Sequence, residues 1–248
     1  MENADKRLAV LIDGENAPRT AIKEIMAECV KYGTPTIKRI YGDWAMSNMD
    51  SWKPLMLENA LIPVQQYSYT TGKNSSDSAM IIDAMDILYS QPVDGFVLVS
   101  SDSDFTRLGL RLREAGKVVY GIGEKKTPSP FIAACDKFIY VEIIRGGELE
   151  KEEKESHKTA APKAKSKQIP AQVVELIAAT IQDVSDEDGW TFMGELGNIL
   201  LKKQPDFDPR NYGYEKLTSL VKSIDSIEID ARPTSAPGVK HIYARVKR

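Results

Sequence analysis

The chain is poor in cysteine and histidine, with only two of each among its 248 residues. Two cysteines, Cys29 and Cys135, cannot form a disulfide framework, and both stand in apolar helical contexts that are typical of buried free thiols. The histidines, His157 and His241, stand far along the chain from the acidic motifs described below. The sequence therefore disfavours zinc chemistry and a Ser-His catalytic triad.

Long apolar runs and an excess of positive charge are also missing. Runs such as Phe96 to Val99 are far shorter than the roughly 20 residues that cross a bilayer. The N-terminal segment MENADKR leads into a strand-like LAVLID with no apolar signal region. We therefore expect a cytoplasmic protein with no membrane partner. Because the net charge is −3, any binding of nucleic acid must rely on local basic patches.

One segment is depleted of apolar residues altogether. Residues 148–167, ELEKEEKESHKTAAPKAKSK, contain no aromatic residue and almost no aliphatic residue beyond Leu149. Such a segment cannot bury enough apolar surface to offset the entropy of ordering. We interpret it as a flexible charged linker between a domain at 1–147 and a domain at 168–248. Its first part, ELEKEEKE, is also compatible with an exposed helical extension of the first domain.

The first domain alternates short apolar runs with amphipathic segments. LAVLID and GFVLVS are apolar without alternation, as strands covered on both faces are. The pattern predicts an α/β fold, a Rossmann-like parallel sheet with right-handed crossovers. Strands are predicted at Leu8–Ile12, Thr36–Tyr41, Leu61–Tyr67, Phe96–Ser100, Val118–Gly123 and Phe138–Ile143. Helices are predicted at Pro18–Lys31, Lys53–Ala60, Asp77–Tyr89, Asp104–Ala115 and Pro130–Cys135.

The second domain has a different order of elements, three helices followed by a β-hairpin. Helices are predicted at Ala171–Gln182, Met193–Leu201 and Tyr214–Ile224, and hairpin strands at Ser226–Ile229 and Val239–Val246. This is the order of a small winged-helix domain.

Four aspartates stand where the predicted sheet places its ligand-binding edge. Asp13 ends the first strand, Asp102 and Asp104 follow the fourth, and Asp77 opens the helix that leads into the fourth. With a strand order of 3-2-1-4-5, the first and fourth strands flank the point where the order reverses, and ligands bind there. A single aspartate at such a position is often only a helix cap. Four close carboxylates repel one another unless a cation neutralises them.

The oxygen-only donor set predicts the chemistry of that edge. Carboxylates without histidine or cysteine favour Mg²⁺ or Mn²⁺, and a paired-metal site would suit phosphodiester cleavage. Asn16 is a candidate to hold Asp13 or a metal-bound water. Ser100, Ser101, Ser103 and Lys73 are candidates to contact a phosphate, although turns and caps also explain residues of these types. Asp83 and Asp86 lie too far along their helix and are expected to face solvent or pair with bases.

Three segments of the first domain together resemble a known family. LIDGEN, KNSSDSAMIIDAMDIL and LVSSDSDF look like the three motifs of the NYN domain, a branch of the PIN-like nuclease superfamily similar to the LabA and limkain groups. The resemblance covers roughly residues 5 to 145. It implies Mg²⁺- or Mn²⁺-dependent endoribonuclease activity, with metal-binding and catalytic acids at Asp13, Asp77, Asp102 and Asp104 and with Asn16 beside them. Ser101 departs from the family, where relatives often have glycine.

The second domain carries a resemblance of its own. GWTFMGELGNILLKKQPDFDPRNYGYEKLTSLVKSI looks like the OST-HTH or LOTUS module, a winged helix that the resemblance links to binding of RNA or RNA-associated proteins. From Arg232 to Arg248 there are five basic residues and no acid, so the wing and tail form the best basic patch. Candidate RNA contacts in this domain are Lys202, Lys203, Arg210, Tyr214, Lys216, Lys240, Arg245 and Lys247.

These observations leave two main functions open. One is a metal-dependent ribonuclease with a C-terminal RNA-binding module. The other is a non-catalytic adaptor that binds RNA or protein, although the presence of all four motif acids argues against it. A phosphatase of the haloacid type is disfavoured, because its D-x-D motif is replaced here by Asp13 and Glu15. Phosphate-loop nucleotide binding is also disfavoured, because DGENAP is not a glycine-rich turn.

Overall fold

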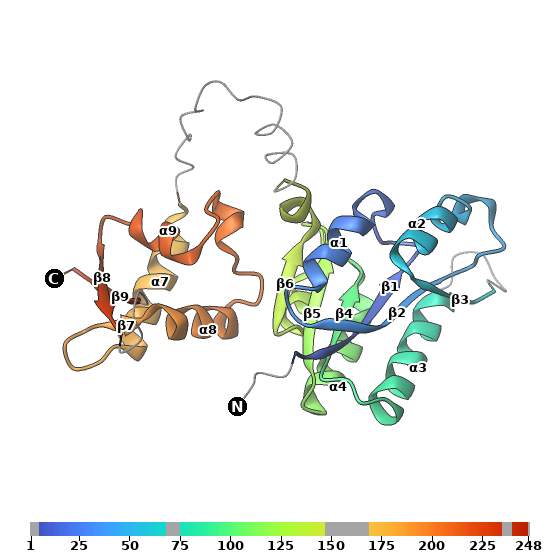
Figure 1. Ribbon diagram of the computed structural model, residues 1–248, viewed down its shortest axis with the longest axis horizontal. Coiled ribbons are helices and arrows are strands. Elements are labelled where there is room, and N and C mark those ends of the chain that lie inside the picture. Colours follow the sequence, from blue (N-terminus) through green and yellow to red (C-terminus); the bar gives the residue numbers. More distant parts are fainter. Residues whose placement is uncertain (1–4, 68–74, 147–168, 235–239, 248) are drawn as a thin grey trace, which may run out of the picture. The chain divides into compact units, whose positions relative to one another are not determined.

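A computed structural model describes residues 5–67, 75–146, 169–234 and 240–247 (Figure 1). The chain divides into two compact units, Met1–Lys158 and Thr159–Arg248. The segment 148–167, interpreted above as a linker, lies outside the described residues. None of the described helices is long and apolar enough to span a membrane.

The N-terminal unit is built on a six-stranded sheet whose strands all run parallel. Its order is β3-β2-β1-β4-β5-β6, so the order of the strands reverses between the neighbours β1 and β4. This confirms the predicted order of the first five strands and places the predicted sixth strand beside β5. The strands are β1 (Arg7–Asp13), β2 (Thr34–Gly42), β3 (Ile62–Gln65), β4 (Gly95–Val99), β5 (Val118–Gly123) and β6 (Lys137–Tyr140).

Helices cover both faces of this sheet, which explains why its central strands are apolar without alternation (Figure 1). One apolar layer joins the sheet to α1 (Ile22–Cys29) and α2 (Trp52–Asn59). The opposite layer joins it to α3 (Ser75–Ser90), α4 (Thr106–Glu114) and α5 (Ser129–Ala133). Short 3₁₀ turns are η1 (Arg19–Ala21), η2 (Ser47–Met49) and η3 (Ser103–Phe105).

The end of the sixth strand differs from the prediction. A strand was expected to reach Ile143, but β6 ends at Tyr140 and residues 141–146 are helical. Val141 and Ile144 are both buried, and a spacing of three places them on one face of a helix. Apolar periodicity alone did not separate a short strand from a short helix here.

The C-terminal unit combines helices with a small antiparallel sheet, as predicted. Its helices are α7 (Ala171–Val184), α8 (Met193–Lys203) and α9 (Leu217–Lys222), with the 3₁₀ turn η4 at Pro209–Tyr212. The sheet order is β7-β9-β8, formed by β7 (Thr191–Phe192), β8 (Ile227–Pro233) and β9 (Lys240–Val246). The helices and the sheet enclose one apolar core that contains Ile177, Leu196, Leu200, Leu220 and Ala244.

The third helix of this unit starts later than predicted. It was expected from Tyr214, but α9 begins at Leu217, after η4 and Gly213. Gly213 adopts a left-handed conformation with φ of 83°, which ends the 3₁₀ turn and breaks the helical path. The two-residue strand β7 was not predicted, because such a short strand leaves no pattern in the sequence.

Candidate functional site

The first part of the site is the end of β1, where Asp13 is almost completely buried. Its carboxylate accepts hydrogen bonds from the backbone N–H groups of Glu15 and Asn16, both at 3.2 Å. It also accepts from Asn16 Nδ2 at 2.9 Å and from the hydroxyl of Ser100 at 2.8 Å. Asn16 therefore holds Asp13, the first of the two roles suggested by the sequence. Four donors fix the Asp13 carboxylate in one orientation.

The turn after Asp13 requires glycine at the next position. Gly14 donates its N–H to the carbonyl of Tyr41 at 2.9 Å. A Cβ atom at Gly14 would lie 2.7 Å from that same oxygen, too close for any other residue without a shift of the backbone. The DG pair thus lets the chain leave β1 tightly against β2 and turn the following amides toward Asp13.

Ser100 connects the ends of β1 and β4. Its hydroxyl donates to Asp13 and accepts from the N–H of Asp102 at 3.1 Å. Ser100 is only 2% exposed, and its hydroxyl is engaged with these two acids of the site. Asp102 in turn accepts the N–H of Asp104 at 2.9 Å and caps η3. The hydrogen bonds from Asp102 to Ser100 and from Asp104 to Asp102 each join residues two positions apart, which accounts for the alternation of Ser100, Asp102 and Asp104 in SSDSD.

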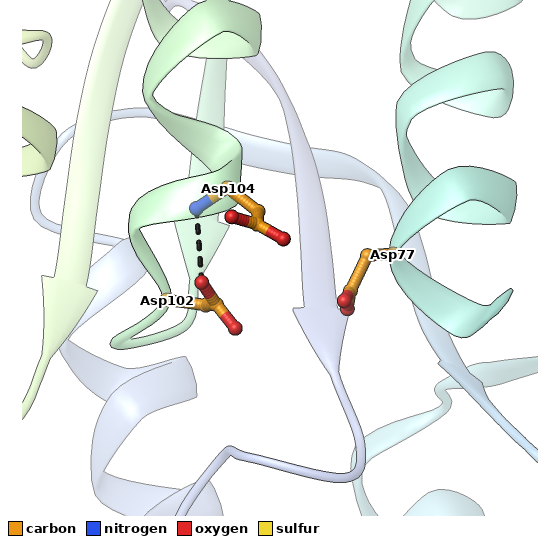
Figure 2. A group of neighbouring side chains, drawn as sticks. All are labelled: Asp77, Asp102 and Asp104. Atoms are coloured by element: carbon orange, nitrogen blue, oxygen red, sulfur yellow. Dashed lines mark hydrogen bonds between the residues drawn. The ribbon is translucent and has the colours of Figure 1, made fainter. Parts of the chain in front are cut away.

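Three carboxylates meet at this edge of the sheet. Asp77 stands in the first turn of α3, while Asp102 and Asp104 follow β4 (Figure 2). One oxygen from each lies within 4.8 Å of the others. Asp13, the fourth predicted acid, is not in this group, although its charge acts on Asp77. The structure thus brings together three of the four predicted acids and places Asp13 next to them as an organised, buried charge.

The electrostatics of Asp77 reflect this crowding. Burial and the negative charges of Asp13, Asp102, Glu15 and Asp104 raise its pKa to about 7. Each of these charges disfavours ionisation of Asp77, and a bound cation would relieve the repulsion. Three carboxylate oxygens with no histidine or cysteine in the group form a hard donor set that fits Mg²⁺ or Mn²⁺. The sequence did not single out Glu15 as part of this electrostatic environment.

The edge of the sheet that carries Asp77, Asp102 and Asp104 is called the rim below. The other residues predicted at the rim are Ser101, Ser103 and Lys73. The Ser101 hydroxyl accepts the N–H of Glu124 at 2.9 Å, and Ser103 is exposed at the start of η3. Lys73 lies outside the described residues. Asp83 accepts from the side chains of Arg39 and Tyr41, in line with the expectation that it pairs with a base away from the rim.

The basic candidates of the C-terminal unit fall into two groups. Lys203, Arg210 and Arg245 are ion-paired with Asp183, Asp208 and Glu228, respectively. The second group is exposed and forms no ion pair with any residue in the described ranges: it consists of Lys202, Lys216, Lys240 and Lys247. Tyr214 is half-buried against the core of the unit. The first group is thus engaged with acids of its own unit, whereas the second group has no such partner among the described residues.

Comparisons with known proteins match this two-unit architecture. Residues 7–143 match the NYN domain, and residues 163–239 match the OST-HTH/LOTUS domain. No curated protein matches the chain.

Three solved structures are among those similar to the chain. A Vibrio parahaemolyticus protein of unknown function is 18% identical, with a TM-score of 0.47, and the match covers 56% of this chain and 94% of that one. An uncharacterized Nitrosomonas europaea protein is 35% identical, with a TM-score of 0.30 and coverage of 37% and 91%. A Chromobacterium violaceum protein, residues 175–257, is 26% identical, with a TM-score of 0.25 and coverage of 34% and 85%.

Proposed function

The chain belongs to the NYN domain family, and on that basis we propose that it is a metal-dependent endoribonuclease whose C-terminal OST-HTH/LOTUS domain binds RNA. The NYN domain is a branch of the PIN-like nuclease superfamily, which supports hydrolysis of a nucleic acid. The observation that carries the proposal is the group of Asp77, Asp102 and Asp104, whose oxygens lie within 4.8 Å of one another.

These three aspartates would hold one or two divalent cations, Mg²⁺ or Mn²⁺. When bound at such a site, the cation lowers the pKa of a water molecule and stabilises the charge that develops during phosphodiester cleavage. Burial and the neighbouring carboxylates raise the pKa of Asp77 to about 7, so a cation that binds there below this pH would displace a proton from Asp77.

The surrounding residues of the chain set the geometry of the acids. The Ser100 hydroxyl bridges the Asp13 carboxylate and the backbone N–H of Asp102, and the Asn16 side chain donates a further hydrogen bond to Asp13. We propose that Asp13 supplies negative charge beside the three ligands and that Asn16 and Ser100 position it. Contacts of this kind outside the ligand group typically change metal affinity or activity by about 10- to 100-fold when they are removed.

Capture of the substrate must come from elsewhere, because an acidic rim repels phosphates. The exposed lysines of the C-terminal unit, Lys202, Lys216, Lys240 and Lys247, are our candidates for phosphate contacts. Ser101 and Ser103 remain candidates to contact the phosphate at the rim itself, as does Lys73.

The test is to incubate the full chain with end-labelled RNA and DNA in the presence of Mn²⁺, Mg²⁺ or a chelator. We expect internal cleavage of RNA that needs the metal, is stopped by the chelator and is lost in Asp102→Asn. Asp86→Asn is the matched control, because Asp86 is an exposed aspartate of α3 outside the acid group. RNA that is bound but never cleaved with any metal would contradict the enzyme and favour the adaptor.

A further inference from the structure

The outer face of the C-terminal sheet carries a cluster of rings and arginines, of which only Arg245 is named above as a candidate RNA contact. Along β9, Ala244 is fully buried, whereas its neighbours Tyr243 and Arg245 reach the surface. On β7, Thr191 is buried and Phe192 is 39% exposed. We call this surface the aromatic face, and its residues are Trp190, Phe192, Arg232, His241, Tyr243 and Arg245.

The side chains of the aromatic face contact one another in a continuous row. The Arg232 guanidinium lies 4.3 Å from the Tyr243 ring centre and 5.1 Å from that of Trp190. Arg245 lies 4.5 Å from the same Trp190 ring. At the other end, the Phe192 ring is 5.8 Å from Tyr243 and 5.1 Å from His241. The row therefore alternates guanidinium groups and rings as far as Tyr243 and ends in the rings of Phe192 and His241, and each of these flat groups presents a π surface.

The arginines in this row already have acidic partners. Arg232 is paired with Asp230 at 2.9 Å, and Arg245 is paired with Glu228 at 2.6 Å. Arg245 also donates to the carbonyl of Asp188 at 3.2 Å. Because their charges are balanced within the sheet, these guanidinium groups are poor candidates for phosphate contacts and are held as flat surfaces.

The loop before β7 fixes Trp190 in this row. The carboxylate of Asp186 accepts the N–H groups of Asp188 and Trp190 at 3.1 and 2.7 Å. Gly189 has φ of 82°, a conformation that other residues rarely adopt. These contacts fix the backbone at Trp190, and the indole itself is contacted by the guanidinium groups of Arg232 and Arg245. A ring that is ordered before the ligand binds loses less entropy on stacking.

We propose that the aromatic face binds the unpaired bases of single-stranded RNA by stacking. This inference rests on the proposed RNA-binding function of the C-terminal unit and assigns it a surface. Rings and guanidinium planes are the groups on which single-stranded bases stack. The face is balanced in charge, and two exposed lysines that form no ion pair with any described residue flank it along the chain: Lys240 begins β9 and Lys247 follows it. This arrangement suits a ligand with flat neutral bases and a charged backbone.

The first experiment separates base stacking from attraction to phosphate. The full chain is titrated, with chelator present to prevent cleavage, with an oligouridine of about 12 nucleotides and with an abasic strand of the same length. We expect the abasic strand to bind at least about tenfold more weakly, although its charge is the same. Equal affinity for both strands would overturn the inference.

The second experiment removes single rings. We expect Phe192→Leu and Tyr243→Leu each to weaken oligouridine binding by about tenfold and to leave the salt dependence unchanged. The matched control is Tyr89→Leu, because Tyr89 is an exposed tyrosine that also contacts an arginine, Arg111, but lies on α3. Phe192 is the more exposed ring, so its variant tests binding even if Tyr243→Leu lowers the melting temperature.

A second pair of variants separates a failure of this inference from a failure of the proposed function. Lys240→Ala and Lys247→Ala should reduce the slope of affinity against salt while preserving the preference for oligouridine over the abasic strand. If the ring variants bind oligouridine like the parent chain, the aromatic face does not take bases, and a protein partner becomes its occupant. Failure of the parent chain to bind any RNA would instead overturn the proposed function.

Discussion

The acidic rim of the N-terminal unit and the aromatic face of the C-terminal unit differ in how their charges are balanced. At the rim, Asp77, Asp102 and Asp104 bring like charges within 4.8 Å, and burial with these charges raises the pKa of Asp77 to about 7. On the aromatic face, Arg232 and Arg245 are each paired with an acid of the same sheet. A site with unrelieved like charge is suited to a counter-ion, whereas a site with balanced charge is suited to a neutral, flat ligand.

The largest expected effect is at the rim. Asp77→Asn and Asp104→Asn should each slow metal-dependent RNA cleavage by at least about a hundredfold, because each removes one of three ligand oxygens. Single-turnover cleavage at saturating RNA measures this loss, with Asp86→Asn as the control. Parent-like rates in either variant would mean that the carboxylate group is not the catalytic centre.

A smaller effect, on RNA affinity, is expected when the C-terminal unit is deleted. Removal of residues 168–248 should weaken RNA affinity by about 10- to 100-fold, because several exposed lysines are lost, while cleavage at saturating RNA changes little. Binding and single-turnover cleavage at low and moderate salt test this difference. Unchanged affinity with an unchanged salt slope would assign the C-terminal unit to a protein partner.

A further variant tests the positioning of the acids. Ser100→Ala removes the hydroxyl that joins Asp13 to Asp102 and should lower activity by about tenfold without unfolding the chain. Ser90→Ala is a suitable control, because the exposed Ser90 hydroxyl donates to the carbonyl of Asp86 within its own helix. If Ser100→Ala raises the metal concentration needed for half-maximal cleavage and the control does not, the positioning role is supported. Equal behaviour of the two variants would contradict it.

The smallest expected effect is a dependence of stability on pH. The folded state raises the pKa of Asp77 from 3.8 to about 7, so the folded state favours its neutral form. The resulting stabilisation is complete below about pH 4 and is lost as the pH rises through 7. The melting temperature of the metal-free chain should fall by a few degrees over this range, and the fall should be smaller in Asp77→Asn. A fall of the same size in Asp77→Asn and the parent chain would show that Asp77 is not its source.

The sequence was informative about the rim because the chemistry there follows from topology. Acids that end β1 and follow β4 lie at the same edge of the sheet, so the apolar pattern and the expected strand order together placed Asp13 and Asp102 there. The contacts of Ser100 could not be predicted, because the hydrogen bonds that join Asp13 to Asp102 through its hydroxyl depend on the register between β1 and β4. The aromatic face was missed for a related reason. Arg245 looked like a phosphate contact, and only the pairing of β8 with β9 places Glu228 opposite it.

The central claim is that the three aspartates bind a divalent cation, and calorimetric titration of the full chain with Mn²⁺ at pH 8 tests it most directly. We predict saturable binding by the parent chain and by Asp86→Asn, and at least about tenfold weaker binding by Asp77→Asn, which loses one of the three ligand oxygens. Mn²⁺ affinity in Asp77→Asn equal to that of the parent chain would contradict the claim.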